Sequence, residues 1–383
     1  MIKIITGVRR CGKSFLLLSY IDYLKANDSK ANIIFIDFTK VEFENLLEYH
    51  QLLKFISENW KPNKNNYVLI DEVQMCKNFE IAVNDLFSSN KYDIYLTGSN
   101  AFLLSSDLAT LFTGRYMSIN IFPFSFQEYL DIFEIKENYQ QAFDEYARIG
   151  SLPGVYQFEN DREKSDYIEN VFQVAILKDI IQKYKIRNIS VLEKVSDFLI
   201  NNISNITSIH NIAQTLAQEK TPINYKTLSS YVNYLCQAFV FYSCKRYDLV
   251  GKEYLKSGEK FYLSDHGVRY AKHGFKNLNF DRMYENIVAI ELMRLGYKVY
   301  VGKLYKKEID FVAESRNEKF YIQVADNISN EEVFNREVNS LLQIKDGFPK
   351  ILIARTFHET ATYEGIKIID LVDWLRKTNN WTN

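Results

Sequence analysis

The stretch Met1–Ser14, MIKIITGVRRCGKS, decides how the first part of the chain folds. The isoleucines within residues 2–5 make a short apolar run that is typical of a buried strand. Residues Gly7–Ser14 then fit the pattern G-x-x-x-x-G-K-[ST], in which a glycine-rich loop points its backbone N–H groups at phosphate oxygens. Apolar residues at helical spacing follow as far as Leu24. A strand before the loop and a helix after it favour a phosphate-binding loop over a chance glycine turn.

The side chains of this loop suit a nucleotide with a metal ion. We expect Lys13 to reach the β- and γ-phosphates and the Ser14 hydroxyl to help hold Mg²⁺. The expected cofactors are therefore ATP and Mg²⁺. The nucleotide-binding residues that we predict are the loop and the first helical residues, namely Gly7, Val8, Arg9, Arg10, Cys11, Gly12, Lys13, Ser14 and Phe15.

A second apolar run, residues 67–74 (YVLIDEVQ), ends in the acids Asp71 and Glu72. In phosphate-loop ATPases the aspartate at this strand end holds Mg²⁺, and the adjacent glutamate polarises the attacking water. A strand followed by a solvated acidic turn would have the same pattern. The presence of Lys13 and Ser14 in the same chain favours the catalytic interpretation.

A third apolar run, residues 94–100 (IYLTGSN), ends in polar residues. Thr97, Ser99 or Asn100 could sense the γ-phosphate from the strand beside the Asp71 strand, and we include Asn100 among the nucleotide-binding residues. A plain glycine turn after a strand is an equally good explanation.

Arg115, in the stretch LFTGRY, is a candidate cation for transition-state charge, either within its own chain or across a subunit interface. A surface arginine is the commoner case. The order of strands and helices up to this point predicts an α/β fold with a parallel sheet, whose ligand lies at the carboxyl ends of the strands.

The motifs TGVRRCGKS, LIDEVQ, LTGSN and FTGRY followed by FPFSFQEYL resemble those of an AAA-like P-loop ATPase family (AAA_14-type). Members of that family carry a C-terminal domain of unknown function (DUF4143-type, restriction-endonuclease-like). The resemblance covers essentially the whole chain and implies an ATPase. The chain departs from it in one respect, because family members usually have a short helical stretch before the first strand.

The rest of the chain is expected to form two further domains. Two helices around a short turn (residues 209–216 and 225–239) and two following strands (residues 240–247 and 260–264) predict a helix-turn-helix with a wing. Its second helix carries few cations, so a packing or linker role is favoured over binding in a nucleic-acid groove. The expected domains are an AAA-like P-loop ATPase domain (1–150), a helical and winged-helix domain (151–275) and a small α/β restriction-endonuclease-like domain (276–383).

The last of these domains resembles a nuclease frame that has lost part of its site. Glu285 and Asp310 match two of the acids that would hold a divalent metal. Gln323 stands where the next acid is expected, and Ala325 replaces the lysine. We therefore favour a retained fold without cleavage, since an amide ligates Mg²⁺ weakly. Glu308 lies on the same strand face as Asp310 and leaves an active nuclease as the alternative.

Composition limits the partners. The 383 residues carry a net charge of −1 and are 47% hydrophobic, so any nucleic-acid site must be a local patch. No apolar run approaches the ~20 residues of a membrane span. The four cysteines lack paired spacing and indicate reduced thiols in a cytoplasmic protein.

The preferred function is an ATP-hydrolysing switch that couples nucleotide state to the winged-helix and nuclease-like modules. One alternative is an ATP-dependent nucleic-acid-processing enzyme with an active nuclease. Another is an ATP-operated scaffold that binds a partner protein. A homo-oligomer is compatible with each of the three.

Overall fold

The computed structural model describes residues 1–98, 112, 114–219, 221, 223–274 and 279–377. The chain forms two compact units. The first consists of Met1–Pro123 together with the short segments Ala175–Ile186 and Gln237–Phe239. The second contains the remaining three segments, Phe124–Val174, Arg187–Cys236 and Val240–Asn383.

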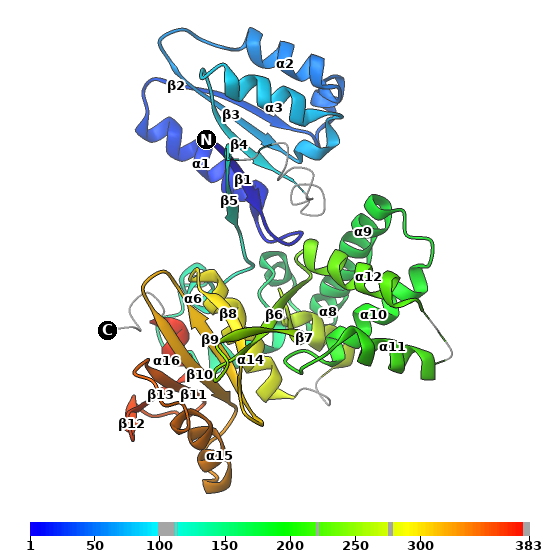
Figure 1. Cartoon of the computed structure of the whole chain (residues 1–383). Helices are drawn as coiled ribbons and strands as arrows, with labels where there is room; N and C mark the ends of the chain where they lie inside the picture. The colour runs from blue at the N-terminus through cyan, green and yellow to red at the C-terminus, as the bar shows by residue number, and fades with distance from the viewer. Residues whose placement is uncertain (99–111, 113, 220, 222, 275–278, 378–383) are drawn as a thin grey trace. The chain divides into compact units, whose positions relative to one another are not determined.

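The first unit is built on a parallel five-stranded sheet, drawn in blue to cyan in Figure 1. Its order is β2-β3-β4-β1-β5, and every neighbouring pair runs parallel. The predicted α/β fold with a parallel-sheet P-loop layout is confirmed. The strands are β1 (Ile2–Thr6), β2 (Ala31–Asp37), β3 (Asn65–Asp71), β4 (Asp93–Thr97) and β5 (Tyr116–Asn120).

Helices cover the two faces of this sheet because alternate strand residues are apolar on both sides. Helix α1 (Lys13–Asn27) packs through Leu17 and Ile21 on the face that carries Ile5 and Leu69. Helices α2 and α3 cover the other face (Figure 1). The helical segments are η1 (Val41–Leu46), α2 (Tyr49–Glu58), η2 (Val73–Met75), α3 (Phe79–Ser88) and, from later in the chain, α9 (Leu177–Tyr184).

The second unit contains a mixed eight-stranded sheet in the order β12-β13-β11-β10-β9-β8-β6-β7. Strands β10, β11 and β13 run parallel to one another, whereas β9 is antiparallel to both of its neighbours. The strands are β6 (Phe241–Asp248), β7 (Glu253–Leu263), β8 (Lys298–Leu304), β9 (Lys307–Glu314), β10 (Lys319–Ala325), β11 (Lys350–Ala354), β12 (Ala361–Tyr363) and β13 (Ile366–Asp370).

The hairpin β6–β7 is part of this sheet, because β6 pairs in parallel with β8. It does not stand apart as a wing, so the predicted winged helix is not supported. The same sheet contains strands from both sides of residue 275, and the three-domain division stays a prediction. The preceding helical segments are α8 (Asp161–Asn170), a π-helical segment (Val171–Ile176), α9, α10 (Ile189–Asn201), α11 (Ile209–Gln218) and α12 (Tyr225–Gln237).

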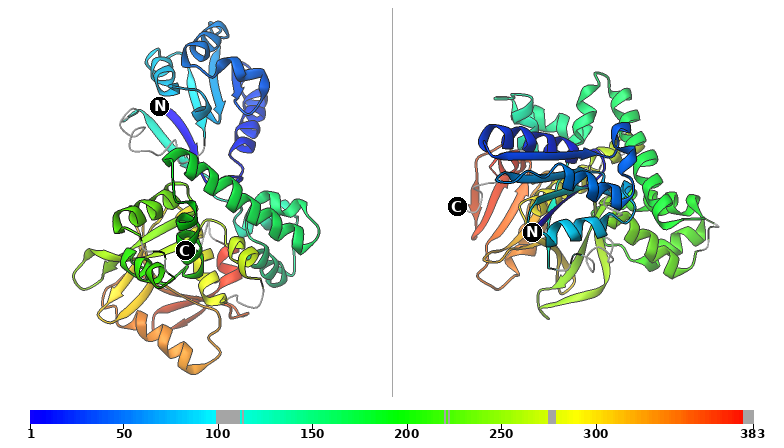
Figure 2. Two further views of the ribbon diagram at one scale, coloured as in Figure 1. Left: turned by 90° about the vertical axis from the view of Figure 1, so that its right-hand side faces the viewer. Right: turned by 90° about the horizontal axis from the view of Figure 1, so that it is seen from above.

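Two long helices pack on the second sheet. Helix α14 (Phe280–Arg294) contacts β7 to β10, and α15 (Glu331–Leu342), orange in Figure 2, contacts β9, β10, β11 and β13. The order along the chain from α14 is one helix, the three strands β8 to β10, the helix α15 and the strand β11. Shorter elements complete the unit: α6 (Phe126–Ile132), α7 (Tyr139–Ile149), η3 (Pro153–Gln157), α13 (Gly267–His273) and α16 (Leu371–Arg376). Within the described ranges, no helix has the length and apolarity needed to cross a bilayer.

Candidate active site

The loop after β1 has the shape that its glycines predict. Gly7 is buried with φ 150°, and a Cβ at this position would collide with the carbonyl oxygen of Ile121. Gly12 adopts a left-handed conformation with φ 106° immediately before α1. Both positions are unfavourable for residues with a side chain. The chain can therefore curl at this point and begin a helix whose first N–H groups are available to an anion.

Lys13 lies inside this loop and is 7% exposed. Its Nζ donates hydrogen bonds to the carbonyl oxygens of Gly7 (2.9 Å) and Val8 (3.1 Å). Ser14 is exposed in the first turn of α1. Among the residues that the structure describes, the hydrogen-bond acceptors of this buried ammonium group are neutral. Its positive charge favours an incoming phosphate.

The acids at the end of β3 are fixed by the neighbouring strand β4. Asp71 is 3% exposed and accepts a hydrogen bond from the Thr97 hydroxyl. The Thr97 oxygen also accepts the backbone N–H of Glu72 at 3.2 Å. Of the three residues considered as γ-phosphate sensors, Thr97 thus contacts the acidic pair. Ser99 and Asn100 lie outside the described residues.

Glu72 is held in an unusual backbone conformation with φ 54°. Residues other than glycine rarely adopt this left-handed region, and such positions cluster at functional sites. Its carboxylate is half-buried and accepts a hydrogen bond from the Gln74 amide. The Asp71 and Glu72 carboxyls therefore both have defined hydrogen-bond partners.

The remaining residues that were predicted to bind nucleotide differ from one another in exposure and in contacts. Arg9 is exposed, and its Nη1 pairs with Asp179 of α9 at 2.8 Å. Arg10 is exposed with φ 67°, and the Phe15 side chain is 74% exposed. Cys11 is buried, as is Val8. The loop is therefore joined to a helix that comes from the middle of the chain.

Arg115 lies at the wrong end of the sheet for a role within its own chain. Its carbonyl accepts the N–H of Ile2, the first residue of β1, whereas the phosphate-binding loop follows Thr6 at the other end. Ile2 and Thr6 are four residue steps apart, which is about 13 Å at about 3.3 Å per residue. Its guanidinium is 3.4 Å from the Asn84 amide oxygen on α3. This distance disfavours an action in cis, and the actions in cis and across an interface both stay predictions.

A second cluster of acids forms in the other unit, where the sequence suggests a degenerate nuclease. Glu285, Glu308 and Asp310 surround a lysine, Lys260 of β7, which is 2% exposed. The Lys260 Nζ lies 2.8 Å from Glu285, 2.6 Å from Glu308 and 3.3 Å from Asp310. The predicted acids thus come together, but around an ammonium group. Among the residues that the structure describes, no cluster of acids, histidines or cysteines forms a metal site.

The electrostatics of this cluster follow from burial and neighbouring charges. Burial raises the pKa of Glu285 to about 8, although Lys260 and the hydroxyl of Tyr262 act in the opposite direction. Burial alone would lower the pKa of Lys260, but Glu285, Asp310 and Glu308 raise it above the usual value. Lys260 therefore stays charged near neutral pH, while Glu285 binds a proton as the pH falls below 8.

Gln323 takes part in a buried hydrogen-bond chain instead of ligating a metal. Its Oε1 accepts the N–H of Asp310 at 3.1 Å, and its Nε2 donates to Glu337 at 2.9 Å. The Asp310 carboxylate accepts the N–H of Val324 at 2.9 Å. Ala325 is buried and offers no polar side chain. The amide at position 323 therefore has a structural role that an acid would disturb.

Sequence reasoning missed Lys260, because the strand that carries it was assigned to a wing. Its position is fixed by Asn286 of α14, whose amide binds the N–H and the C=O of Leu263 at 2.7 and 2.9 Å. A signal was present, since Lys260 is followed directly by the apolar run 261–263. A lysine beside such a run is rarely buried without a charged partner.

The comparisons with known proteins agree with the predicted AAA-like domain in the first unit and differ from the family predicted for the rest of the chain. Residues 1–130 match the family model of an AAA domain (AAA_14), and residues 140–279 match a domain of unknown function (DUF8612). The expected DUF4143-type assignment is therefore wrong, and no nuclease relationship follows from these matches. A solved Walker-type ATPase of Pyrococcus abyssi is 14% identical over 70% of this chain and 90% of that chain, with a TM-score of 0.41. A score below 0.5 supports no functional argument.

Two relatives match most of the chain. An uncharacterized protein of Methanocaldococcus jannaschii is 28% identical over 88% of this chain and 77% of that protein. An uncharacterized protein of Haemophilus influenzae is 38% identical over 98% of this chain and 94% of that protein. Residues 1–130 form an AAA domain with a P-loop ATPase-like fold. At this identity and coverage, the chain belongs to the same protein family as the H. influenzae protein.

Proposed function

We propose that the protein is an ATPase that binds ATP with Mg²⁺ at the loop 7–14 and hydrolyses it to ADP and phosphate. The observation that carries the proposal is the fixed acidic pair Asp71 and Glu72 at the carboxyl end of β3, in the same sheet as the loop after β1. One strand, β4, separates the two, so they are two strand spacings or about 10 Å apart. That interval suits a terminal phosphate with its metal ion between the loop and the acids.

The chain's own residues have distinct roles in this proposal. Lys13 would exchange its two carbonyl acceptors for phosphate oxygens, and the N–H groups at the start of α1 would bind the same phosphates. Ser14 and Asp71 would hold Mg²⁺, which neutralises charge on the β- and γ-phosphates. Glu72 would orient the attacking water and accept its proton. The remaining proposed nucleotide contacts are Gly7, Val8, Arg9, Arg10, Cys11, Gly12, Phe15 and Asn100.

The proposal includes a switch that starts at the loop. Arg9 can pair either with Asp179, as observed, or with the phosphates of a nucleotide, and the two choices compete. Helix α9 is covalently continuous with segments of the second unit on both sides. Nucleotide binding would break the ion pair between Arg9 and Asp179 and so release α9 and the segments joined to it.

Two substitutions test the enzymatic core of the proposal. Lys13→Ala should abolish ATP binding, because the phosphates lose their main cation. Glu72→Gln should keep binding and lower turnover by about 100-fold or more, since only water activation is lost. Binding would be followed with a fluorescent ATP analogue, and turnover by phosphate release.

The matched control is Glu58→Gln, an exposed acid on α2 that should leave both quantities unchanged. Unchanged turnover in Glu72→Gln would remove Glu72 from the role of base. Binding that survives Lys13→Ala at full strength would contradict nucleotide binding at this loop.

The two alternative functions are separated by measuring turnover alone, with single-stranded DNA, with duplex DNA and with RNA. Stimulation by one nucleic acid would favour a processing enzyme, and indifference would favour a switch or a protein-binding scaffold, in each case as a cytoplasmic protein. We propose that the second unit does not cleave nucleic acid, because the Lys260 ammonium already occupies the space between Glu285, Glu308 and Asp310 in which a metal ion would bind.

A further inference from the structure

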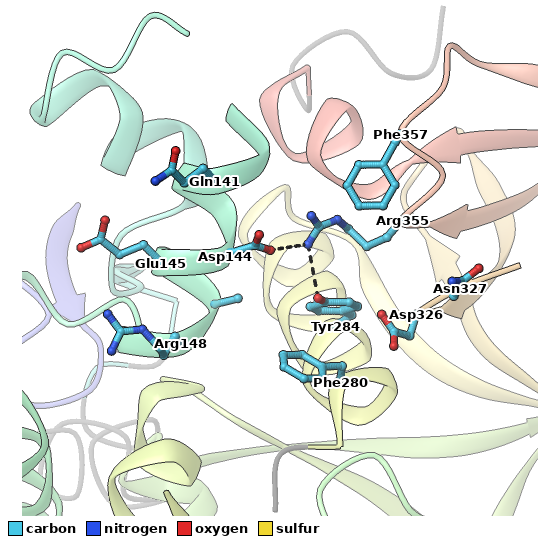
Figure 3. A pocket seen from close by; sticks show the side chains of 11 residues that line it. Gln141, Asp144, Glu145, Arg148, Phe280, Tyr284, Asp326, Asn327, Arg355 and Phe357 are labelled. Carbon is cyan, nitrogen blue, oxygen red and sulfur yellow. Dashed lines mark hydrogen bonds and ion pairs between the residues drawn. The ribbon is translucent and has the colours of Figure 1, made fainter. Parts of the chain in front are cut away.

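The second unit contains a pocket that the proposed ATPase does not use. It has a volume of about 700 Å³ and lies at the carboxyl ends of the parallel strands β10 and β11, between α7 and the start of α14 (Figure 3). Ligands of open α/β sheets commonly bind at such strand ends, and the volume is in the range of small-molecule sites. The side chains used below are Asp144, Phe280, Tyr284, Asp326, Arg355 and Phe357.

Two aromatic rings stand exposed at this pocket. Phe280 is 40% and Phe357 is 63% exposed. The backbone at Phe357 has φ 58°, and the N–H groups of Phe357 and Thr356 both donate to Asp370 Oδ2, at 2.9 and 3.0 Å. The ring is thus presented by a fixed, strained segment instead of being buried. Exposed aromatic faces of this kind suit stacking with a planar ligand.

Arg355 forms the polar wall and is itself 7% exposed. Its Nη1 donates to Asp144 at 2.7 Å and to the Tyr284 hydroxyl at 3.3 Å, as Figure 3 shows. Its guanidinium lies 4.9 Å from the centre of the Phe357 ring. Its Nε has no hydrogen-bond partner in the part of the chain that the structure describes. A buried N–H donor without an acceptor raises the free energy of the folded protein. A ligand that offers a hydrogen-bond acceptor to the Nε edge of the guanidinium would remove this cost.

Asp326 supplies acceptors on the neighbouring strand end. Its backbone N–H donates to Asp281 at 2.8 Å, which fixes the residue, but the described residues offer its carboxylate no hydrogen bond or ion pair. Burial, and next the carboxylate of Asp281, raise the pKa of Asp326, and Arg355 opposes them. A ligand that donates hydrogen bonds would relieve this cost.

These groups define the chemistry of the ligand. It must be planar with apolar faces, and its edge must carry acceptors for Arg355 and donors for Asp326. A cationic side chain is disfavoured, since the guanidinium of Arg355 already lies over the aromatic rings and would repel a second cation.

We propose that this pocket binds a guanine base. Guanine presents two adjacent N–H donors, at N1 and N2, which match the two oxygens of the Asp326 carboxylate. Its O6 and N7 are the acceptors that arginine pairs with most often in nucleic-acid recognition. Three carboxylates (Asp144, Glu145 and Asp326) and two guanidinium groups (Arg148 and Arg355) line the pocket, so the lining keeps a net negative charge. This charge disfavours a phosphate inside the pocket, and the sugar and phosphate lie outside.

The test is a binding measurement by isothermal titration calorimetry on the full chain. Guanosine, GMP and the oligonucleotide d(TTTGTTT) are compared with adenosine and d(TTTATTT), in wild-type protein and in Lys13→Ala. We expect the guanine-containing ligands to bind in both proteins and the adenine-containing ligands to bind at least tenfold more weakly. Tighter binding of the oligonucleotide than of GMP identifies single-stranded nucleic acid as the source of the base, and equal binding identifies a free nucleotide.

Two variants connect this binding to the pocket. Asp326→Asn and Phe357→Ala should each weaken guanine binding by about tenfold to 100-fold, in line with the loss of a bidentate base contact or a stacking partner. Glu359→Gln, an exposed acid nearby in sequence that does not line the pocket, should not change it. Thermal unfolding followed by circular dichroism checks each variant, and either one suffices if the other is misfolded.

Several results would overturn the proposal. They are the absence of binding by every guanine ligand, equal binding of guanine and adenine, and undiminished binding in both variants. An arginine-containing peptide that binds to wild-type protein and not to Asp326→Asn would instead identify a cation pocket.

Discussion

The two units each contain a buried lysine, and the surroundings of the two amines differ in kind. Lys13 donates to the neutral carbonyl oxygens of Gly7 and Val8. Lys260 contacts the carboxylates of three acids. The positive charge of Lys13 is therefore uncompensated and available to an anion, whereas that of Lys260 is neutralised inside the protein. Burial alone does not distinguish a binding lysine from a structural one, but the charge of its acceptors does.

The largest expected effect on stability is that of Lys260→Met. Removing the ammonium leaves buried carboxylates without a counter-charge, which costs about 3–5 kcal/mol when one partner of a buried pair is lost. Lys13→Met removes only hydrogen bonds to carbonyl groups, and it should cost about 1 kcal/mol. Urea unfolding of the two variants measures the difference.

The control for this prediction is the double variant Lys260→Met with Asp310→Asn, which removes one of the orphaned carboxylates and should recover part of the loss. Equal destabilisation by Lys260→Met and Lys13→Met would contradict the proposed distinction between the two lysines.

The same contrast explains how much of each site could be predicted from the sequence. Residues Gly7–Ser14 form one uninterrupted stretch, and Asp71 and Glu72 are adjacent, so local spacing was enough to find them. The sequence indicates Thr97, Ser99 or Asn100 only as possible γ-phosphate sensors. That Thr97 contacts Asp71 depends on the register of β4 against β3, which local spacing does not give.

The Lys260 cluster depends instead on pairing between strands that are distant in sequence. Lys260 reaches Glu285 and Asp310 because the hairpin β6–β7 joins the sheet through β8. This pairing has no signal in local periodicity.

A smaller effect concerns the pH dependence of stability. Burial raises the pKa of Glu285 from its ordinary value of 4.5 to about 8 in the folded protein, so folding takes up a proton between these values. Its contribution to stability is complete below about pH 4.5 and is lost as the pH rises toward 8. We expect the free energy of unfolding to decrease between pH 5 and pH 8, and Glu285→Gln to flatten this dependence. Urea unfolding at unit steps of pH measures it, and a steeper dependence in the variant would contradict the assignment.

The smallest expected effect is that of Arg115→Ala on ATP turnover within a single subunit. Arg115 lies at the amino end of β5, at the opposite end of the sheet from the loop after β1, and its side chain approaches Asn84. In dilute protein we therefore expect turnover to change by less than about twofold, far below the ~10³-fold loss of an arginine finger. Phosphate release measured over a range of protein concentrations gives the comparison. A large loss that appears only at high concentration, and that is partly restored by adding Lys13→Ala protein, would place Arg115 at the active site of a neighbouring copy, because each variant then supplies the residue that the other lacks.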